Sequence, residues 1–254
     1  MKLLKAMAIA FSIYSKIPVP QFEWKEEDME YMMCFFPWIG GVIGMFFFGW
    51  AVLCEKFAVG NVCYALIGAA IPLMISGGFH VDGYMDTMDA FHSYQSREKK
   101  LEILKDSHIG AFAAIMLALY YMIDIAAISE IHTQKAVSAV AAVFFLARCF
   151  SGIAVMTLQP AKKEGLLYTF ASSAQKVRVK AALYFQAALC VVLMLFVSGW
   201  YGAAAIGAAL LSFFYFKKKS YKELGGITGD TAGFFVTVCE AAAAAAVAVA
   251  GYFL

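Results

Sequence analysis

The sequence has few charged residues and almost no excess of either sign. Charged residues make up 15% of its 254 residues and hydrophobic residues 63%, and the formal net charge at pH 7 is +2. The mean hydropathy of +0.74 lies far above that of soluble globular domains. These values exclude a soluble fold, and the near-neutral balance gives no reason to expect a nucleic-acid partner.

Several other features are absent. The six cysteines show no C-x-x-C spacing and lie in or beside apolar runs, which indicates small buried residues and excludes a disulfide framework or a cysteine metal site. There is no internal repeat, and no stretch resembles a flexible linker. We therefore expect a single membrane-embedded domain over residues 1–254.

Long apolar runs, by contrast, recur along the chain. A bilayer crossing needs about 17 to 25 residues, and seven candidates are residues 33–54, 59–79, 109–129, 136–158, 181–197, 201–216 and 232–254. The sixth is near the lower length limit. The pattern predicts an all-α, polytopic integral membrane bundle of about seven transmembrane helices. A short apolar run after Lys2 and Lys5 predicts a further, interfacial helix at the N-terminus.

Lysine and arginine are unevenly distributed along the chain. Seventeen of the 20 fall in four segments, namely residues 2–25, 97–105, 162–180 and 217–222. The connections between them carry only Lys56 and Lys135. Because positively charged loops stay in the cytoplasm, we expect the N-terminus inside and the C-terminus outside.

Three aspartates lie close together in the segment GGFHVDGYMDTMDAFHS. On a helix, the spacing of Asp82, Asp86 and Asp89 places all three carboxylates on one face. Such carboxylates repel one another unless a cation neutralises them, and their oxygens suit Mg²⁺. The segment therefore predicts a metal site for a phosphate-bearing substrate. The alternative is a solvated loop helix, which would not need the interleaved glycines.

Two further segments, KDSHIG and GGITGDTAG, each precede an apolar run. Asp106 or Ser107, and Asp230, fit the N-cap positions of helices. A glycine-rich turn that opens a helix also offers free N–H groups to an anion. Thr228, Gly229 and Asp230 could therefore bind phosphate and metal together, and the sequence leaves both readings open.

Three ionisable residues, Asp124, Arg148 and Glu240, fall inside apolar runs. An unpaired charge at the bilayer centre costs about 2.5 to 3.5 kcal/mol on insertion scales, so each is expected to face the bundle interior. Arg148 and Glu240 can form a structural ion pair, or the Arg148 guanidinium can bind a phosphate group in a cavity. Asp124 lies nearer the outer face and is expected to be structural.

Taken together, these segments resemble the adenosylcobinamide-GDP ribazoletransferase family, also called cobalamin synthase. The resemblance rests on HVDGYMDTMDAF, LKDSHIGAF, PAKKEGLLYTF and GGITGDTAGFFVTVCE, with FSIYSKIPVP near the N-terminus. These blocks extend in order from residue 11 to residue 240. The resemblance implies a Mg²⁺-dependent enzyme of vitamin B12 synthesis, in the inner membrane of a prokaryotic cell, with its active site at the cytoplasmic face.

The resemblance also implies a reaction and a set of site residues. The enzyme would transfer the adenosylcobinamide-phosphate group of adenosylcobinamide-GDP to α-ribazole or its 5′-phosphate and release GMP. The expected metal ligands are Asp82, Asp86, Asp89 and Asp230, and the expected base is Asp106 or His80. Expected substrate contacts are Lys16, Lys105, His108, Arg148, Gly226, Thr228, Gly229 and Glu240. The expected partners are these substrates and the lipid bilayer. A homo-oligomer and contact with other B12-pathway enzymes are both compatible with the resemblance.

The chain departs from the family pattern at three positions. Arg is common in the family where this chain has His108, Gly where it has Ala90, and Arg where it has Lys16. If that first Arg binds phosphate in relatives, His108 would do so more weakly and in a pH-dependent way.

Two other classes of protein share some of these features. Intramembrane carboxylates also mark cation transporters, but these usually bind their ion near the midplane between repeats. A Mg²⁺-dependent prenyltransferase or CDP-alcohol phosphotransferase catalyses a related reaction on a diphosphate, with aspartate motifs that bind the metal. The second requires a D-G-x2-A-R start to its acidic motif, which D-G-Y-M-D-T lacks.

Overall fold

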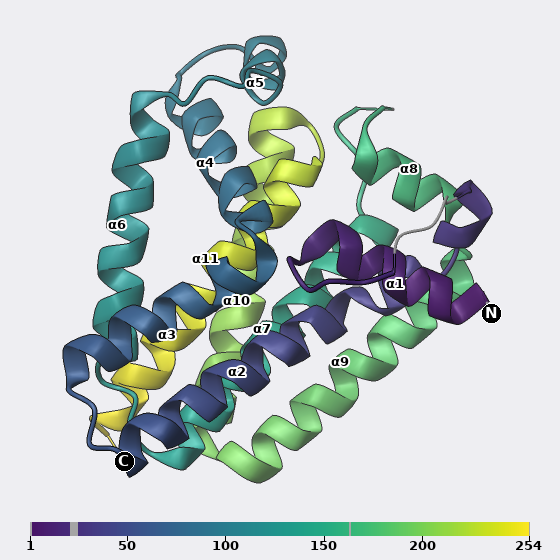
Figure 1. Cartoon of the computed structure of the whole chain (residues 1–254). Coiled ribbons are helices and arrows are strands. Elements are labelled where there is room, and N and C mark those ends of the chain that lie inside the picture. The colour runs from purple at the N-terminus through teal and green to yellow at the C-terminus, as the bar shows by residue number, and fades with distance from the viewer. Residues whose placement is uncertain (1, 21–24, 163, 254) are drawn as a thin grey trace.

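The computed structural model describes residues 2–20, 25–162 and 164–253, which fold into one helical bundle (Figure 1). The helices are α1 (Lys2–Tyr14), α2 (Phe36–Lys56), α3 (Asn61–Ser76), α4 (Phe79–His92), α5 (Arg97–Ile103), α6 (Ala111–Ile128), α7 (Gln134–Thr157), α8 (Leu166–Ser173), α9 (Lys176–Ser198), α10 (Trp200–Leu224) and α11 (Gly229–Gly251). Short 3-10 turns, η1 (Glu26–Met29) and η2 (Met32–Cys34), lead into α2. Among the described residues, extended pairing is limited to an isolated bridge between Pro160 and Ile227.

Helices α7 and α11 form the centre of the bundle. Their apolar windows are 78% and 72% buried, against 22% to 39% for α2, α6 and α9. The outer helices instead expose large apolar side chains, including Phe46, Met122 and Phe196. An apolar surface of this extent is unsuited to water and is expected where lipid surrounds the protein.

Glycines let α2 pack closely against α7. A Cβ atom on Gly40 would overlap the backbone carbonyl of Phe144, and one on Gly44 would overlap that of Ala141. These two glycines stand four residues apart on one helix face, the spacing that brings backbones together in membrane helices. The all-α membrane bundle predicted from the sequence is confirmed.

The predicted number of seven spans is not confirmed. Among the described residues, five helices are long and apolar enough to cross a membrane: α2, α6, α7, α9 and α11. Helices α3 and α4 make a sixth only if they count as one span, although they are bent by 97°. Helix α10, expected to span at 201–216, continues to Leu224, takes up four lysines and is not among these five. It nevertheless packs against α7, α9 and α11.

The bend between α3 and α4 depends on two consecutive glycines. Gly77 and Gly78 have φ values of 66° and 85°, the left-handed region that glycine enters without a Cβ penalty. Gly77 ends α3, since its N–H donates to the carbonyl of Leu73 at 2.9 Å. The chain then turns sharply into α4, the helix that carries the aspartate motif.

The lysine-rich segments meet at one end of the bundle, which we call the basic end. Lys100 on α5 pairs with Glu223 at the end of α10, and Lys105 pairs with Glu164 at 2.6 Å. Arg178 at the start of α9 donates to the Tyr31 hydroxyl at 2.8 Å, which joins this segment to the N-terminal region. Lys163 lies outside the described residues. The single-ended clustering is the arrangement predicted from the charge distribution.

Candidate active site

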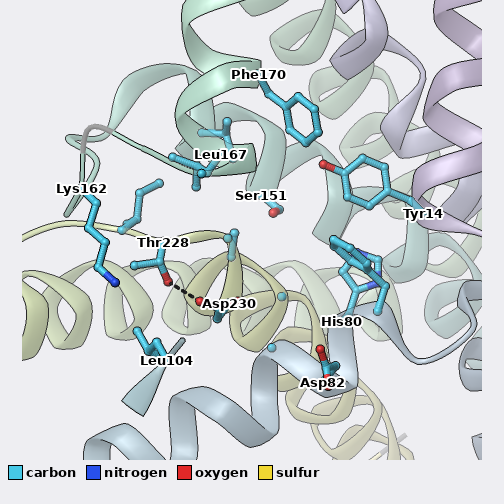
Figure 2. Close-up of a pocket in the computed structure, with 18 of the residues that line it drawn as sticks. Tyr14, His80, Asp82, Leu104, Ser151, Lys162, Leu167, Phe170, Thr228 and Asp230 are labelled. Atoms are coloured by element: carbon cyan, nitrogen blue, oxygen red, sulfur yellow. Dashed lines mark hydrogen bonds between the residues drawn. The ribbon is translucent and has the colours of Figure 1, made fainter. Parts of the chain in front are cut away.

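A cavity of about 520 Å³ lies at the basic end of the bundle (Figure 2). Helices α1, α2, α4, α7, α8 and the start of α11 contribute to its wall, together with η2 and the loops before α6, α8 and α11. The side chains with polar or charged groups that line it are Tyr14, His80, Asp82, Lys105, Ser151, Lys162, Glu164, Thr228 and Asp230. Of the predicted site residues, the cavity therefore brings together His80, Asp82, Lys105, Thr228, Gly229 and Asp230.

Asp82 and Asp230 reach one cavity because α4 and α11 cross at glycines. A Cβ atom on Gly83 would lie 2.8 Å from the backbone oxygen of Asp230, and one on Gly233 would lie 3.1 Å from that of His80. Any side chain at Gly83 would push the two helices apart. The glycines between the aspartates thus position the acidic groups, which a solvated loop helix would not require.

The start of α11 is built by Thr228, not by Asp230. Thr228 is the N-cap, and its hydroxyl oxygen accepts the N–H of Thr231 at 3.1 Å. The same hydroxyl donates to Asp230 at 3.3 Å. Because the cap is supplied by Thr228, the Asp230 carboxylate is left to face the cavity at the positive end of the helix dipole.

The PAKKEGLLYTF segment joins the cavity through the glycine-rich turn. The N–H of Ile227 donates to the carbonyl of Gln159 at 3.0 Å, and the N–H of Ala161 donates to that of Ile227 at 2.8 Å. Gly226 is required for this pairing, since a Cβ there would lie 2.6 Å from the Gln159 oxygen. Gly226 therefore holds the turn and does not itself line the cavity.

Two residues of this segment, Lys162 and Glu164, line the cavity although the sequence did not single them out. The Lys162 ammonium donates to the carbonyl of Leu101 at 2.7 Å. Partial burial, and to a smaller extent the nearby charge of Lys105, lower the pKa of Lys162 below its usual value. Glu164 has a lowered pKa because it accepts a hydrogen bond from Lys105. Two cationic groups at one end of a cavity suit a phosphate ligand.

The remaining aspartates of the α4 motif do not line the cavity. Asp89 instead accepts the N–H of Ala113 at 3.1 Å, in the first turn of α6, and its carboxylate fills the space beside Gly110. Asp86 stands between Asp82 and Asp89 on the same face of α4, and its charge is opposed by those of Asp82, Asp230 and Asp89. Asp82, Asp86 and Asp89 thus lie on one face of α4, as predicted, but their side chains contact different parts of the bundle.

The described residues contain no group of three or more His, Cys, Asp or Glu side chains that could hold a metal ion as they stand. Mg²⁺, however, is usually held by one or two protein carboxylates, and water and substrate phosphates complete its coordination. Asp82 and Asp230 supply two carboxylates of this kind. The donor set therefore fits Mg²⁺ shared with a phosphate ligand.

Asp106 and His108 lie outside the cavity wall. Their side chains are 57% and 90% exposed and are joined to each other at 2.6 Å. Hydrogen bonds from the ring and the N–H of His108 lower the pKa of Asp106. Asp106 is not the N-cap of α6, which is Gly110. Lys16 packs across Gly77 at the α3–α4 bend and also lies outside the wall.

Arg148 and Glu240 pair with each other in the bundle interior. Arg148 donates to Glu240 at 2.6 Å and to the carbonyl of Phe144 at 2.8 Å, and its side chain is 1% exposed. Neither residue lines the cavity. Of the two roles open at the level of sequence, this geometry is that of a structural ion pair between α7 and α11. Asp124 is likewise buried.

His80 is buried at the cavity wall without a hydrogen-bond partner. It is 5% exposed, and neither ring nitrogen makes a hydrogen bond. The rings of Tyr14, Phe36 and Phe79 surround it at centroid distances of 6.1, 5.7 and 5.7 Å. Tyr14 and its neighbours were not predicted as site residues, although the FSIYSKIPVP block contains Tyr14.

The fold and this cavity define a multi-pass helical membrane protein with a charged, ligand-sized site at one end. The chain belongs to the family whose sequence model is described as cobalamin-5-phosphate synthase, which matches residues 6–248. It is therefore an enzyme of cobalamin biosynthesis, as the sequence motifs predicted, and the transporter and other transferase readings are not favoured.

Curated relatives cover nearly the full chain. An adenosylcobinamide-GDP ribazoletransferase of Lachnoclostridium phytofermentans is 44% identical over 250 residues, which cover 98% of this chain and 95% of the relative. Proteins of the same name from Clostridium botulinum and Azorhizobium caulinodans are 31% and 29% identical, over 94% and 95% of this chain and 94% of each relative. No solved structure matches the chain.

Proposed function

We propose that the chain transfers the adenosylcobinamide-phosphate group of adenosylcobinamide-GDP to a ribose hydroxyl of α-ribazole or its 5′-phosphate, in the cell membrane and at its cytoplasmic face. The observation that carries this proposal is the meeting of Asp82 and Asp230, from two helices, with Lys105 and Lys162 in one cavity. Carboxylates for a divalent cation beside ammonium groups for phosphate oxygens are what attack on a diphosphate requires.

The reaction forms one P–O bond and breaks another. The ribose hydroxyl attacks the corrinoid-side phosphorus, the anhydride bond to the second phosphorus breaks, and GMP leaves with the bridging oxygen. The hydroxyl proton passes to a basic group in the cavity. Of the two predicted bases, Asp106 is not among the lining residues and His80 is. Glu164 supplies a further carboxylate in the same cavity.

Asp82 and Asp230 would hold Mg²⁺, which when bound neutralises charge on the diphosphate oxygens. Lys105 and Lys162 are placed to bind the phosphates and to orient the leaving group, and the N–H groups at the start of α11 offer further donors. Phosphoryl transfer depends mainly on such positioning and charge stabilisation. An amphiphilic corrinoid substrate also suits a site at the membrane surface.

The direct test uses the purified full-length protein in nanodiscs. It is incubated with adenosylcobinamide-GDP, α-ribazole 5′-phosphate and Mg²⁺, and the products are separated and weighed by mass spectrometry. We expect stoichiometric GMP and the joined corrinoid product, and no product after chelation of Mg²⁺ with EDTA. Release of no GMP, or release of GMP without the joined corrinoid product, would contradict the proposal.

A further inference from the structure

The cavity has two ends of opposite character. Lys162 and Thr228 lie at one end, and Tyr14, His80 and Phe170 gather at the other, with Asp230 between them (Figure 2). Phosphate chemistry accounts for the first end. It does not account for a cluster of aromatic rings, which offers little to a phosphate and much to a flat apolar group.

The aromatic end is assembled from separate elements. The Tyr14 ring of α1 lies 4.5 Å from Phe36 of α2, 5.0 Å from Phe79 of α4 and 6.3 Å from Phe170 of α8, measured between ring centroids. All four rings line the cavity. The convergence of four helices on one group of rings leaves an apolar wall at the edge of a charged site, as is common where a ligand has one apolar and one charged part.

His80 adds a specific polar group to this wall. Both ring nitrogens lack a partner, and the side chain is 95% buried, since its exposed fraction is 5%. Buried polar groups in proteins are nearly always hydrogen-bonded. An unpartnered imidazole at a cavity wall therefore indicates that the bound ligand supplies the partner.

We infer that the aromatic end binds the benzimidazole ring of α-ribazole, with a ring N–H of His80 donating to the free ring nitrogen. This inference rests on the proposed function. The ring is flat, apolar and has one free acceptor, since its other nitrogen carries the ribose. It therefore matches an aromatic wall with one unused donor. The ribose would then extend toward Asp82 and Asp230.

The guanine of adenosylcobinamide-GDP fits this end less well. Its edge carries a carbonyl oxygen, a ring N–H and an amino group, which require several paired partners when buried. Apart from His80, this end offers the hydroxyl groups of Tyr14 and Ser151 and the carboxylate of Asp82, which the proposed function assigns to Mg²⁺ and which is therefore not free to receive the guanine N–H groups. Assignment of the guanine to this end is therefore the competing outcome of the test.

The test is equilibrium binding of α-ribazole to the purified full-length protein in nanodiscs, without the corrinoid substrate, by calorimetry. His80→Phe keeps the ring shape and removes the donor, and Phe170→Ala removes one ring. We expect each to weaken α-ribazole binding about tenfold and to leave GMP binding unchanged. Phe213→Ala is the matched control, since Phe213 packs on Phe235 and does not line the cavity.

Two outcomes would overturn the inference. One is unchanged α-ribazole affinity in both variants, and the other is weakened GMP binding with competition between GMP and α-ribazole. Thermal unfolding of each variant confirms that it is folded, and His80→Phe gives the result if Phe170→Ala does not fold. If the wild-type protein releases GMP but its variants bind α-ribazole normally, only this inference fails. If the wild type binds α-ribazole but never releases GMP, the proposed function fails.

Discussion

Asp82 and Asp230 line the cavity, whereas Asp86, Asp89 and Asp106 do not. Asp230→Asn keeps the side-chain shape but removes a metal-binding charge. We expect GMP release to fall about 100-fold or more, equivalent to about 2.7 kcal/mol of transition-state stabilisation, and the Mg²⁺ concentration for half-maximal rate to rise. Steady-state rates over a Mg²⁺ titration measure both quantities.

The matched control is Glu102→Gln, at an acidic residue of the same end that is exposed and pairs with Lys99 at 2.7 Å. Its rate and Mg²⁺ dependence are expected to equal those of the wild type. Near-normal turnover of Asp230→Asn, with an unchanged Mg²⁺ dependence, would remove Asp230 from the metal site.

Lys162 provides a test through pH. Its pKa is lowered by burial and by Lys105, so its charge is lost at a lower pH than that of an ordinary lysine. If the ammonium binds a substrate phosphate, activity falls on the alkaline side as pH rises through this lowered pKa. Lys162→Arg keeps its charge at every pH used, so the alkaline fall is expected to move upward. Superimposable pH–rate profiles would show that Lys162 does not bind phosphate.

Sequence reasoning pointed to some cavity residues whose position follows from local spacing, and it missed others whose position depends on packing. The D-x3-D-x2-D and T-G-D patterns identified Asp82 and Asp230 because helix periodicity and capping are local properties. Tyr14 and Lys162 were missed because they reach the cavity through an α1 packing contact and a loop pairing between residues far apart in the chain. No spacing within a single segment encodes those contacts.

At the scale of elements, the crossing of α4 and α11 sets the distance between the two cavity aspartates. Gly83→Ala would place a methyl group against the backbone of Asp230, where only backbone atoms could move to relieve the overlap. We expect a loss of stability of about 1 to 3 kcal/mol and a larger fractional loss of GMP release, because the aspartates separate. Chemical denaturation in mild detergent and the GMP assay measure the two effects.

Gly207→Ala on α10 is the control for this change, since a Cβ there meets nothing within 4 Å. It is expected to be neutral or slightly stabilising, because alanine favours a helix more than glycine does. If Gly83→Ala behaved like Gly207→Ala, close approach of α4 and α11 would not be what positions the aspartates.

The pair of Arg148 and Glu240 joins α7 to α11 at the bundle centre. Arg148→Met leaves the Glu240 carboxylate buried without its partner, which typically destabilises a protein by about 3 to 5 kcal/mol. Arg148→Met combined with Glu240→Gln removes both charges, so most of the stability is expected to return, and GMP release with it. Denaturant midpoints of the single and double variants measure this. A folded, stable double variant without activity would instead indicate that Arg148 contacts substrate.

At the scale of the whole molecule, composition and hydropathy were sufficient to predict a helical membrane bundle. They did not give the number of spans. The 59–79 run was counted as one span because its apolar residues continue up to Gly77 and Gly78, but backbone freedom at these glycines ends α3 after 16 residues. Hydropathy measures how apolar a segment is and carries no information on where its axis bends.

Membrane orientation is the last property to be tested, and it follows from the two ends of the bundle. The end opposite the basic one holds Gly60 beside Asn61, whose amide donates to the carbonyl of Ser129 at 3.0 Å. Lys218 lies at the basic end. Positive loops remain in the cytoplasm, so Gly60 is expected outside and Lys218 inside.

A membrane-impermeant maleimide applied to intact cells therefore distinguishes the two orientations. Gly60→Cys and Lys218→Cys are each placed in a background with Cys34 and Cys63 replaced by serine, since the other four cysteines are buried. We expect labelling of Gly60→Cys in intact cells and of Lys218→Cys only after lysis. The reverse pattern would place the cavity on the outer face, away from cytoplasmic nucleotides, and would be incompatible with a substrate that carries GDP. Labelling of both variants in intact cells would mean that α10 does not separate the two compartments as its packing against α7, α9 and α11 indicates.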